Sequence, residues 1–259
     1  MRTGDVNGTA RSRALGAACG VLLMFLSACG GSGAEPGRSP GARAPTRAAG
    51  PPAAMSEPRI GRPDTEGRLP GVGERLYAGI PAYTGQAVVV YGDAEDSPDS
   101  EVVFYEREGS VWYEAGRWWG HNGRAGWTTD HHEGDLRTPV GVFTLTDAGG
   151  VLDYPRSGLP YDHNTLSYRV PKGWGEKHRN DFDHVIAIDY NRIPGTPPSD
   201  PTRPEGQKKG GGIWMHVDHG DGTSGCVTLP EDGLDYLLHA LDPERRPVVV
   251  MGDRENLES

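Results

Sequence analysis

The sequence predicts a mainly β domain with one or two short helices. Its apolar runs are three to five residues long and rich in β-branched and aromatic residues, as strands are. Glycine, proline, aspartate and asparagine separate these runs, which is typical of turns. Only one stretch carries apolar residues at helical spacing. The predicted strands are Ala87–Tyr91, Val102–Tyr105, Val111–Tyr113, Val142–Leu145, Val185–Ile188, Ile213–Val217 and Val248–Met251.

Residues 1–28 have the pattern of an export signal. Three arginines near the start precede the apolar stretch Ala14–Leu26, which is too short to span a bilayer comfortably. The run Leu26-Ser-Ala-Cys29 resembles a bacterial lipobox, whose cysteine is lipidated and becomes the first residue of the exported protein. We therefore expect a lipoprotein signal peptide over 1–28 and lipidation of Cys29; cleavage after Ala28 without a lipid is the alternative.

The rest of the chain divides into a tether and one domain. Residues 29–71 are rich in glycine, proline and alanine and lack aromatic residues, so they cannot bury enough apolar surface to repay the entropy of ordering. We expect a disordered tether there. All tryptophans and tyrosines lie in 72–259, a length that suits a single compact domain.

Two segments of the domain differ from the strand pattern. After Pro230 the apolar residues follow helical spacing, and Pro230-Glu231-Asp232 is a plausible first turn. Ile193–Gly212 is polar and rich in proline, glycine and lysine, which predicts an exposed loop. The helical apolar positions are Leu234, Leu237, Leu238 and Leu241.

The charge of the chain excludes some partners. The net charge is −10, and removal of the leader, which holds three arginines and one aspartate, makes it −12. An acidic surface argues against nucleic acid and against electrostatic binding to anionic lipids. We expect the membrane contact to come from the lipid on Cys29, with the domain on the outer face of the membrane, facing the cell wall.

The run from Ile213 to Pro230 carries the strongest chemical signal. It places His216 at the end of an apolar stretch and Cys226 at the tip of a glycine-rich turn. Cys226 is the single thiol left once the leader is removed and Cys29 is lipidated, so a reactive role is favoured over a buried apolar one. A nearby imidazole can take the thiol proton, and small residues leave backbone N–H groups free to hold an oxyanion. The expected turn and oxyanion residues are Thr223, Ser224 and Gly225.

The choice of general base lies between two histidines. His216 adjoins a strand that would fix its position, whereas His219 lies in a glycine-rich stretch that looks like a mobile loop. We therefore favour His216. Asp218, Asp221 or a backbone carbonyl could orient the imidazole, and the sequence does not choose among them.

These residues resemble a known signature. His216 followed by Thr223-Ser-Gly-Cys226 resembles the YkuD-type L,D-transpeptidases, which carry a histidine and then Ser/Thr-x-Gly-Cys. Upstream, Thr138-Pro-Val-Gly141-Val-Phe resembles the Thr-Pro-x-Gly-x-Phe strand entry of that family. The resemblance covers Ala87 to Gly252. Thr228 stands where that family often has arginine or asparagine.

The resemblance implies a fold and an activity. It implies a β-sandwich-like domain that acts on peptidoglycan stem peptides, with Cys226 as nucleophile, His216 as general base and oxyanion N–H groups from Gly225 and Cys226. A thioester forms with a tetrapeptide donor as D-alanine leaves, and an acceptor amine then takes the acyl group to give a 3→3 cross-link. We expect no cofactor, no metal and a monomer.

Three other functions stay open. Water in place of the amine would make the protein an L,D-carboxypeptidase. A zinc hydrolase could use His131, His132, Glu133 and Asp135 or the histidines near Asp218, but there is no His-Glu-x-x-His motif. A wall-binding module that has lost catalysis is the third, although every expected catalytic residue type is present.

Overall fold

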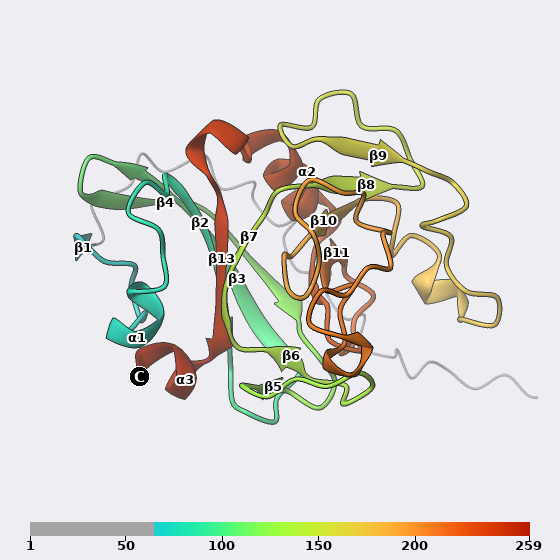
Figure 1. Ribbon diagram of the computed structural model, residues 1–259, viewed down its shortest axis with the longest axis horizontal. Coiled ribbons are helices and arrows are strands. Elements are labelled where there is room, and N and C mark those ends of the chain that lie inside the picture. Colours follow the sequence, from blue (N-terminus) through green and yellow to red (C-terminus); the bar gives the residue numbers. More distant parts are fainter. Residues whose placement is uncertain (1–64) are drawn as a thin grey trace, which may run out of the picture. The chain divides into compact units, whose positions relative to one another are not determined.

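The computed structural model describes residues 65–259 (Figure 1). The expected signal peptide, Cys29 and the tether up to residue 64 lie outside the described residues. The expected boundary at residue 72 is too late, because Thr65–Glu66 already pairs with strand β4 as β1 and Leu69 is buried in the core. No helix within 65–259 has the length and apolar character needed to cross a membrane.

The described chain contains thirteen strands and three α-helices. The strands are β1 Thr65–Glu66, β2 Gln86–Gly92, β3 Asp99–Glu108, β4 Val111–His121, β5 Trp127–Thr128, β6 Thr138–Pro139, β7 Gly141–Thr144, β8 Ala148–Gly150, β9 Tyr161–His163, β10 Val185–Ala187, β11 Trp214–Val217, β12 Val227–Leu229 and β13 Val248–Asp253. The α-helices are α1 Glu74–Tyr77, α2 Glu231–Ala240 and α3 Arg254–Glu258. Short 3-10 turns lie at Glu176–His178, Gln207–Lys209 and Pro243–Arg245.

A six-stranded sheet, in the order β1-β4-β3-β2-β13-β7, forms the centre of the domain. Its middle strands are buried on both faces, which explains their near-continuous apolar sequence. In β2, for example, Val88 and Val90 face one core while Ala87 and Val89 face the other, as the two-residue period of a strand requires.

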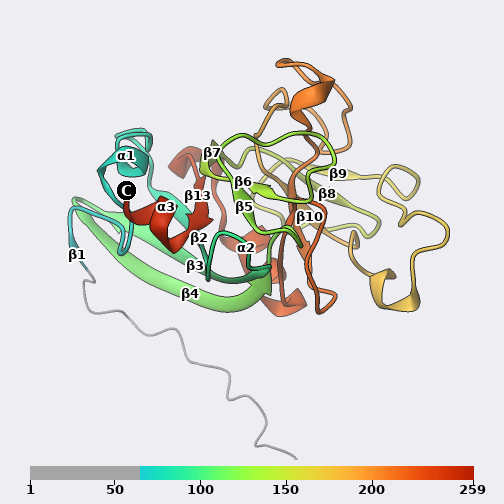
Figure 2. The ribbon, with the colours of Figure 1, turned by 90° about the horizontal axis from the view of Figure 1, so that it is seen from below.

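Different elements cover the two faces of this sheet. Leu76 of α1 and Leu257 of α3 pack on one face, and the Gly73 N–H donates to the Leu257 carbonyl, so the two short helices lie side by side (Figure 2). On the other face, Leu234 and Leu237 of α2 share a core with residues of the second sheet.

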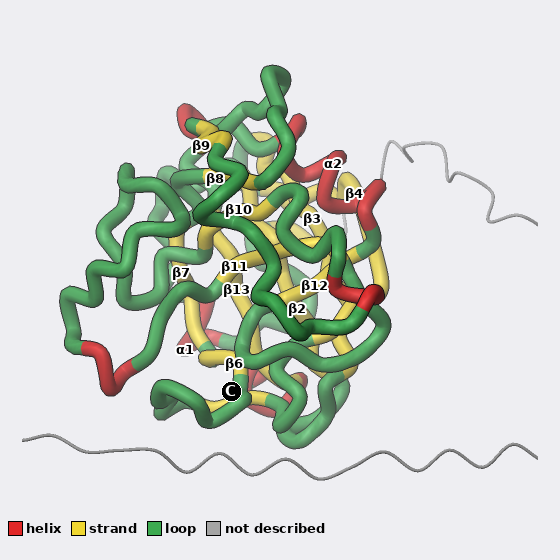
Figure 3. The backbone as a smooth tube through the Cα atoms, turned by 90° about the vertical axis from the view of Figure 1, so that its right-hand side faces the viewer, coloured by secondary structure: helices red, strands yellow, loops and turns green. Residues whose placement is uncertain are grey.

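The second sheet has five short strands in the order β12-β11-β10-β8-β9. Ile186, Met215 and Val227 of this sheet pack in the same core as Val88 of the first, which makes a two-sheet sandwich. Long loops connect the short strands (Figure 3). Because the strands β11 and β12 are parallel neighbours, the chain between them must turn back through a loop, and that loop carries the cysteine turn.

The structure confirms the mainly β class, the seven predicted strand positions and the helix after Pro230. Two differences have physical causes. The hairpin of β3 and β4 extends far beyond its apolar runs, because its ladder of ten residue pairs also includes polar positions. Pro230 caps α2 and does not belong to its first turn, which begins at Glu231.

Candidate active site

Strands β11 and β12 divide their side chains between the core and an open face. In this parallel pair Met215 lies opposite Val227, and His216 lies opposite Thr228. Met215 and Val227 are fully buried in the core. Since alternate side chains of a strand point to opposite faces, His216 and Cys226 point the other way. Both line one pocket of about 700 Å³.

The turn before Cys226 needs glycine at its third position. Gly225 has φ +140°, and a Cβ there would come within 3.0 Å of the Arg137 carbonyl oxygen and 3.2 Å of Ile213 Cδ1. The Thr223 hydroxyl accepts from the Gly225 N–H at 3.0 Å and donates to the Cys226 carbonyl at 2.7 Å. One hydroxyl thus closes the turn on both sides.

The expectation that Gly225 and Thr223 offer N–H groups to an oxyanion is wrong. The Gly225 N–H is used by the Thr223 hydroxyl, and the Thr223 N–H donates to the Asn122 carbonyl at 2.8 Å. Each donor is committed to holding the turn. The backbone N–H groups of Ser224 and Cys226 are the remaining candidates for an oxyanion.

A second threonine ties this turn to the upstream motif. Thr138 is fully buried; its hydroxyl accepts from the Gly123 N–H at 2.7 Å and donates to the Gly225 carbonyl at 2.9 Å. The Thr-Pro motif therefore lies directly behind the cysteine turn. Its threonine fixes where the turn sits.

Replacing Thr138 with valine should loosen the turn, because valine has the same shape and no hydroxyl. It leaves the buried Gly123 N–H and Gly225 carbonyl without a partner, which should cost about 2–4 kcal/mol of unfolding free energy. Urea unfolding measures this loss. Thr202→Val, at an exposed position, is the matched control and should change stability by about 0.5 kcal/mol or less. Equal values for the two variants would contradict the anchoring role.

His216 is held by its own backbone. Its Nδ1 lies 2.9 Å from the Val217 carbonyl oxygen, so the neutral ring donates from Nδ1 and keeps Nε2 as the acceptor. The residue is 3 % exposed, and burial lowers the pKa of the imidazole to about 4. His216 is therefore a neutral base at pH 7, and of the three groups that could have oriented it, the backbone carbonyl does so.

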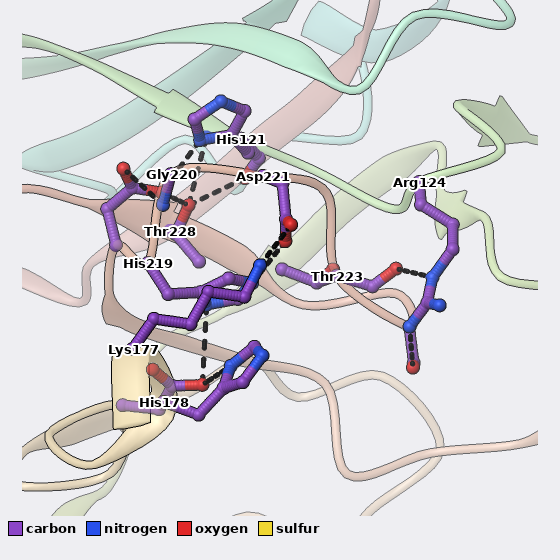
Figure 4. Close-up of polar contacts among 12 residues, drawn as sticks. His121, Arg124, Lys177, His178, His219, Gly220, Asp221, Thr223 and Thr228 are labelled. Carbon is purple, nitrogen blue, oxygen red and sulfur yellow. Dashed lines mark hydrogen bonds and ion pairs between the residues drawn. The ribbon is translucent and has the colours of Figure 1, made fainter. Parts of the chain in front are cut away.

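The two aspartates near His216 have other partners. Asp218 Oδ1 accepts from Thr228 at 2.6 Å and lies 2.7 Å from His121 Nδ1. Asp221 pairs with Lys177 and with Nε2 of His219. Figure 4 shows both groups of contacts. Neither carboxylate orients the His216 ring.

The Cys226 thiol is at rest and protonated. Its Sγ accepts from the Trp214 N–H at 3.4 Å and donates to the Gly212 carbonyl at 3.7 Å. Burial raises the pKa of the thiol to about 11. Because the S–H points to Gly212, proton transfer to His216 requires rotation of the Cys226 side chain.

Without substrate, we expect Cys226 to react slowly with iodoacetamide. A thiol pKa near 11 instead of the ordinary 9 leaves about a hundredfold less thiolate at neutral pH. The alkylation rate, followed by intact mass on residues 30–259, should rise with pH toward a midpoint near 11. Circular dichroism at each pH checks that the fold persists. A midpoint below 8 would mean a resting thiolate–imidazolium pair and would contradict the neutral state.

His219 is not on an open loop, which corrects the expectation from the sequence. Its side chain is only 5 % exposed, and its ring stacks on His216 with 5.9 Å between centroids and 12° between planes. The centroid of the His178 ring lies 4.4 Å from that of His219, with 56° between the ring planes. His219 Nδ1 lies 3.3 Å from Asp181 Oδ2 and Nε2 lies 3.1 Å from Asp221 Oδ1. With both nitrogens beside carboxylates, His219 is a poor base for the thiol.

Other sequence candidates lie apart from the pocket. The Arg137 guanidinium donates to the Trp127 carbonyl at 2.9 Å and pairs with Asp96 at 2.6 Å, so it holds loops together. Buried His131 lies beside Asp135 at 3.0 Å, while His132 is exposed. The alternative zinc set around His131 does not converge in the described chain.

The structure adds pocket residues that the sequence analysis missed. Arg124 brings a guanidinium to the rim, where its Nε and Nη2 lie 3.3 Å from the Thr223 carbonyl and the Ser224 hydroxyl (Figure 4). His178 and Asp181 come from the loop before β10. Trp174 is half exposed and lines the pocket, whereas Trp127 is fully buried.

Comparison with known proteins identifies a relationship. The family model described as the L,D-transpeptidase catalytic domain, YkuD, matches residues 95–250, which is more than half of the chain. No curated protein matches the chain. A solved structure, that of Bd1075 from Bdellovibrio bacteriovorus, is similar at 16 % identity with a TM-score of 0.37, over 65 % of this chain and 48 % of that one. The chain thus spans about half the length of that structure.

Proposed function

Because the chain belongs to the YkuD family of L,D-transpeptidase catalytic domains, we propose that it is a cysteine acyltransferase acting on peptidoglycan stem peptides. The observation that carries this proposal is that Cys226 and His216 line one pocket. The Thr223 hydroxyl holds the cysteine turn, and the Val217 carbonyl holds the His216 ring. A nucleophile and a base on adjacent strands need little reorganisation to meet.

The proposed reaction has two halves. In the first, Sγ of Cys226 gives its proton to Nε2 of His216 and attacks the carbonyl carbon of the L-centre in a tetrapeptide donor. The Ser224 and Cys226 N–H groups stabilise the oxyanion, and D-alanine leaves with the proton from His216. In the second half, an acceptor amine gives a proton to His216, attacks the thioester and releases the thiol, which leaves a 3→3 cross-link.

Mass spectrometry tests this proposal directly. Residues 30–259 are mixed with a disaccharide-tetrapeptide, and both the intact protein and the products are weighed, with Cys226→Ala as the control. An acyl adduct on Cys226 together with dimer product is the expected result. Tripeptide without dimer would mean that water is the acceptor and the enzyme is an L,D-carboxypeptidase. If neither an adduct nor a product forms, the acyltransferase proposal is overturned.

We also propose that the protein is exported and anchored by a lipid on Cys29, on the outer face of the cell membrane. The lipobox-like run Leu26-Ser-Ala-Cys29 supports this, and such an address places the domain beside a cell-wall substrate.

Replacing Cys29 with serine should abolish lipid labelling, because the acceptor thiol is gone. An alkyne fatty acid fed to expressing bacteria and detected on the purified protein measures the modification. Cys19→Ser, within the expected leader, is the matched control and should stay labelled. Equal labelling of the two variants would contradict the assignment of Cys29.

A further inference from the structure

A second cluster of chemically active side chains lies in the wall of the same pocket. His178, Asp181 and His219 come from two separate segments and place one ligand-type atom each within 4.8 Å of one another. Asp181 Oδ2 is 2.9 Å from His178 Nδ1 and 3.3 Å from His219 Nδ1. Cys226 does not belong to this cluster. The proposed acyl transfer uses none of the three side chains.

The cluster is buried and incompletely satisfied. The Asp181 side chain is 2 % exposed and that of His219 is 5 % exposed. Nδ1 of His219 is buried and makes no hydrogen bond; it is near Asp181, but not in hydrogen-bonding geometry. Burial raises the pKa of Asp181, because desolvation of its charge outweighs the two imidazoles. Polar groups in such surroundings normally have a partner.

With its proton on Nε2, His219 would leave Nδ1 as an acceptor for a cation. Its Nε2 lies 3.1 Å from Asp221 Oδ1, and Asp221 is in turn paired with Lys177 (Figure 4). A carboxylate that accepts from one ring nitrogen fixes the lone pair on the other, which is the usual support for a metal-binding histidine. Nδ1 of His219 and the Asp181 carboxylate would then both be acceptors that face each other. Only a positive charge between them satisfies both.

We propose that His178, Asp181 and His219 form a binding site for a divalent transition-metal cation, best matched by zinc. Two imidazole nitrogens and one carboxylate oxygen are typical zinc ligands at about 2.0–2.2 Å. Ligands at that distance around a tetrahedral ion lie about 3.3 Å from one another, close to the two separations given above. The fourth position opens toward the pocket, which the three residues line together with Cys226.

The strongest rival is a second proton on His219, which would form an ion pair with Asp181. Either a proton or a metal ion would give the unsatisfied Nδ1 of His219 a partner, but only a metal site would bind zinc. A measurement of zinc binding distinguishes the metal site from the protonated histidine. That measurement does not depend on whether the protein transfers acyl groups.

The test uses the full chain carrying Cys19→Ser, Cys29→Ser and Cys226→Ser, so that no thiol is left to bind metal. Equilibrium dialysis against zinc with elemental analysis should give one ion per chain, and cobalt in its place should give the visible spectrum of a four-coordinate site without sulfur. Asp181→Asn and His178→Gln should each weaken binding more than about tenfold. His132→Gln, at a 61 % exposed side chain, is the matched control and should bind as before.

Each result decides the proposal. His178 is 19 % exposed and ends a short 3-10 turn, so His178→Gln should fold even if the buried Asp181→Asn does not; thermal unfolding reports this. Loss of binding in a folded His178→Gln protein supports the site. No zinc bound, or undiminished binding in that variant, overturns it. A thiolate-to-cobalt band in the protein with Cys226 intact, and weak binding without that thiol, would assign the cation to Cys226 and overturn it as well.

Discussion

Replacing Cys226 with alanine should remove all acyl transfer and leave the fold intact. The substitution deletes the sulfur that would form the thioester, and no other thiol lies in the described chain. The contacts that shape the turn come from Thr223, Thr138 and the Gly225 backbone, none of which involves Sγ. Loss of one half-buried sulfur should cost about 1 kcal/mol or less. Product mass spectrometry with the disaccharide-tetrapeptide measures turnover.

The controls separate chemistry from folding. Thermal unfolding and far-ultraviolet circular dichroism of Cys226→Ala should match the parent protein closely. Cys226→Ser keeps a small polar group in place, yet its hydroxyl gives up a proton far less readily, so it too should form no detectable adduct. Turnover by folded Cys226→Ala would remove the nucleophile from the mechanism.

The sequence predicted the fold well where a buried strand appears as a short, continuous run of apolar residues. In the central parts of β2, β3 and β13 both faces of the sheet are buried, so these strands carry unbroken apolar runs rich in valine and stand out in the sequence. Strands β5, β6, β8 and β9 have two or three residues each, and no periodicity can be read from so few positions. The long β3–β4 hairpin extends over polar residues that backbone pairing, not apolar burial, holds in register.

In the candidate site, too, the sequence predicted the residues that lie close together in the chain and missed those that come from distant segments. His216 and Cys226 lie ten residues apart in the sequence, and one strand and one turn suffice to predict that they meet the same pocket. Arg124, His178 and Asp181 reach the pocket from distant segments, and nothing local to them signals it. His219 misled for the same reason: its glycine-rich neighbours predict a mobile loop, whereas packing against His178 and His216 buries it.

The resting geometry also explains why the pair should act only with substrate bound. A thiol pKa near 11 and an imidazole pKa near 4 mean that neither group is charged at pH 7. The two would exchange a proton only as the carbon–sulfur bond forms and the charge passes to the oxyanion. Such a thiol is protected from adventitious oxidation, because the thiolate is the reactive form.

Replacing His216 with alanine should slow formation of the acyl adduct by about 10²–10⁴-fold, or about 3–5 kcal/mol in activation free energy. The reason is that Nε2 of this neutral ring would be the base that takes the thiol proton in the pocket that both residues line. Adduct formation on residues 30–259, followed by intact mass over time in chelator-treated buffer, measures the rate. His219→Gln should cost much less, about tenfold at most, because that ring lies between two carboxylates. Imidazole added to His216→Ala should restore part of the rate, which a purely structural role would not allow. A loss in His219→Gln as large as that in His216→Ala, with no rescue of His216→Ala by imidazole, would move the base to His219.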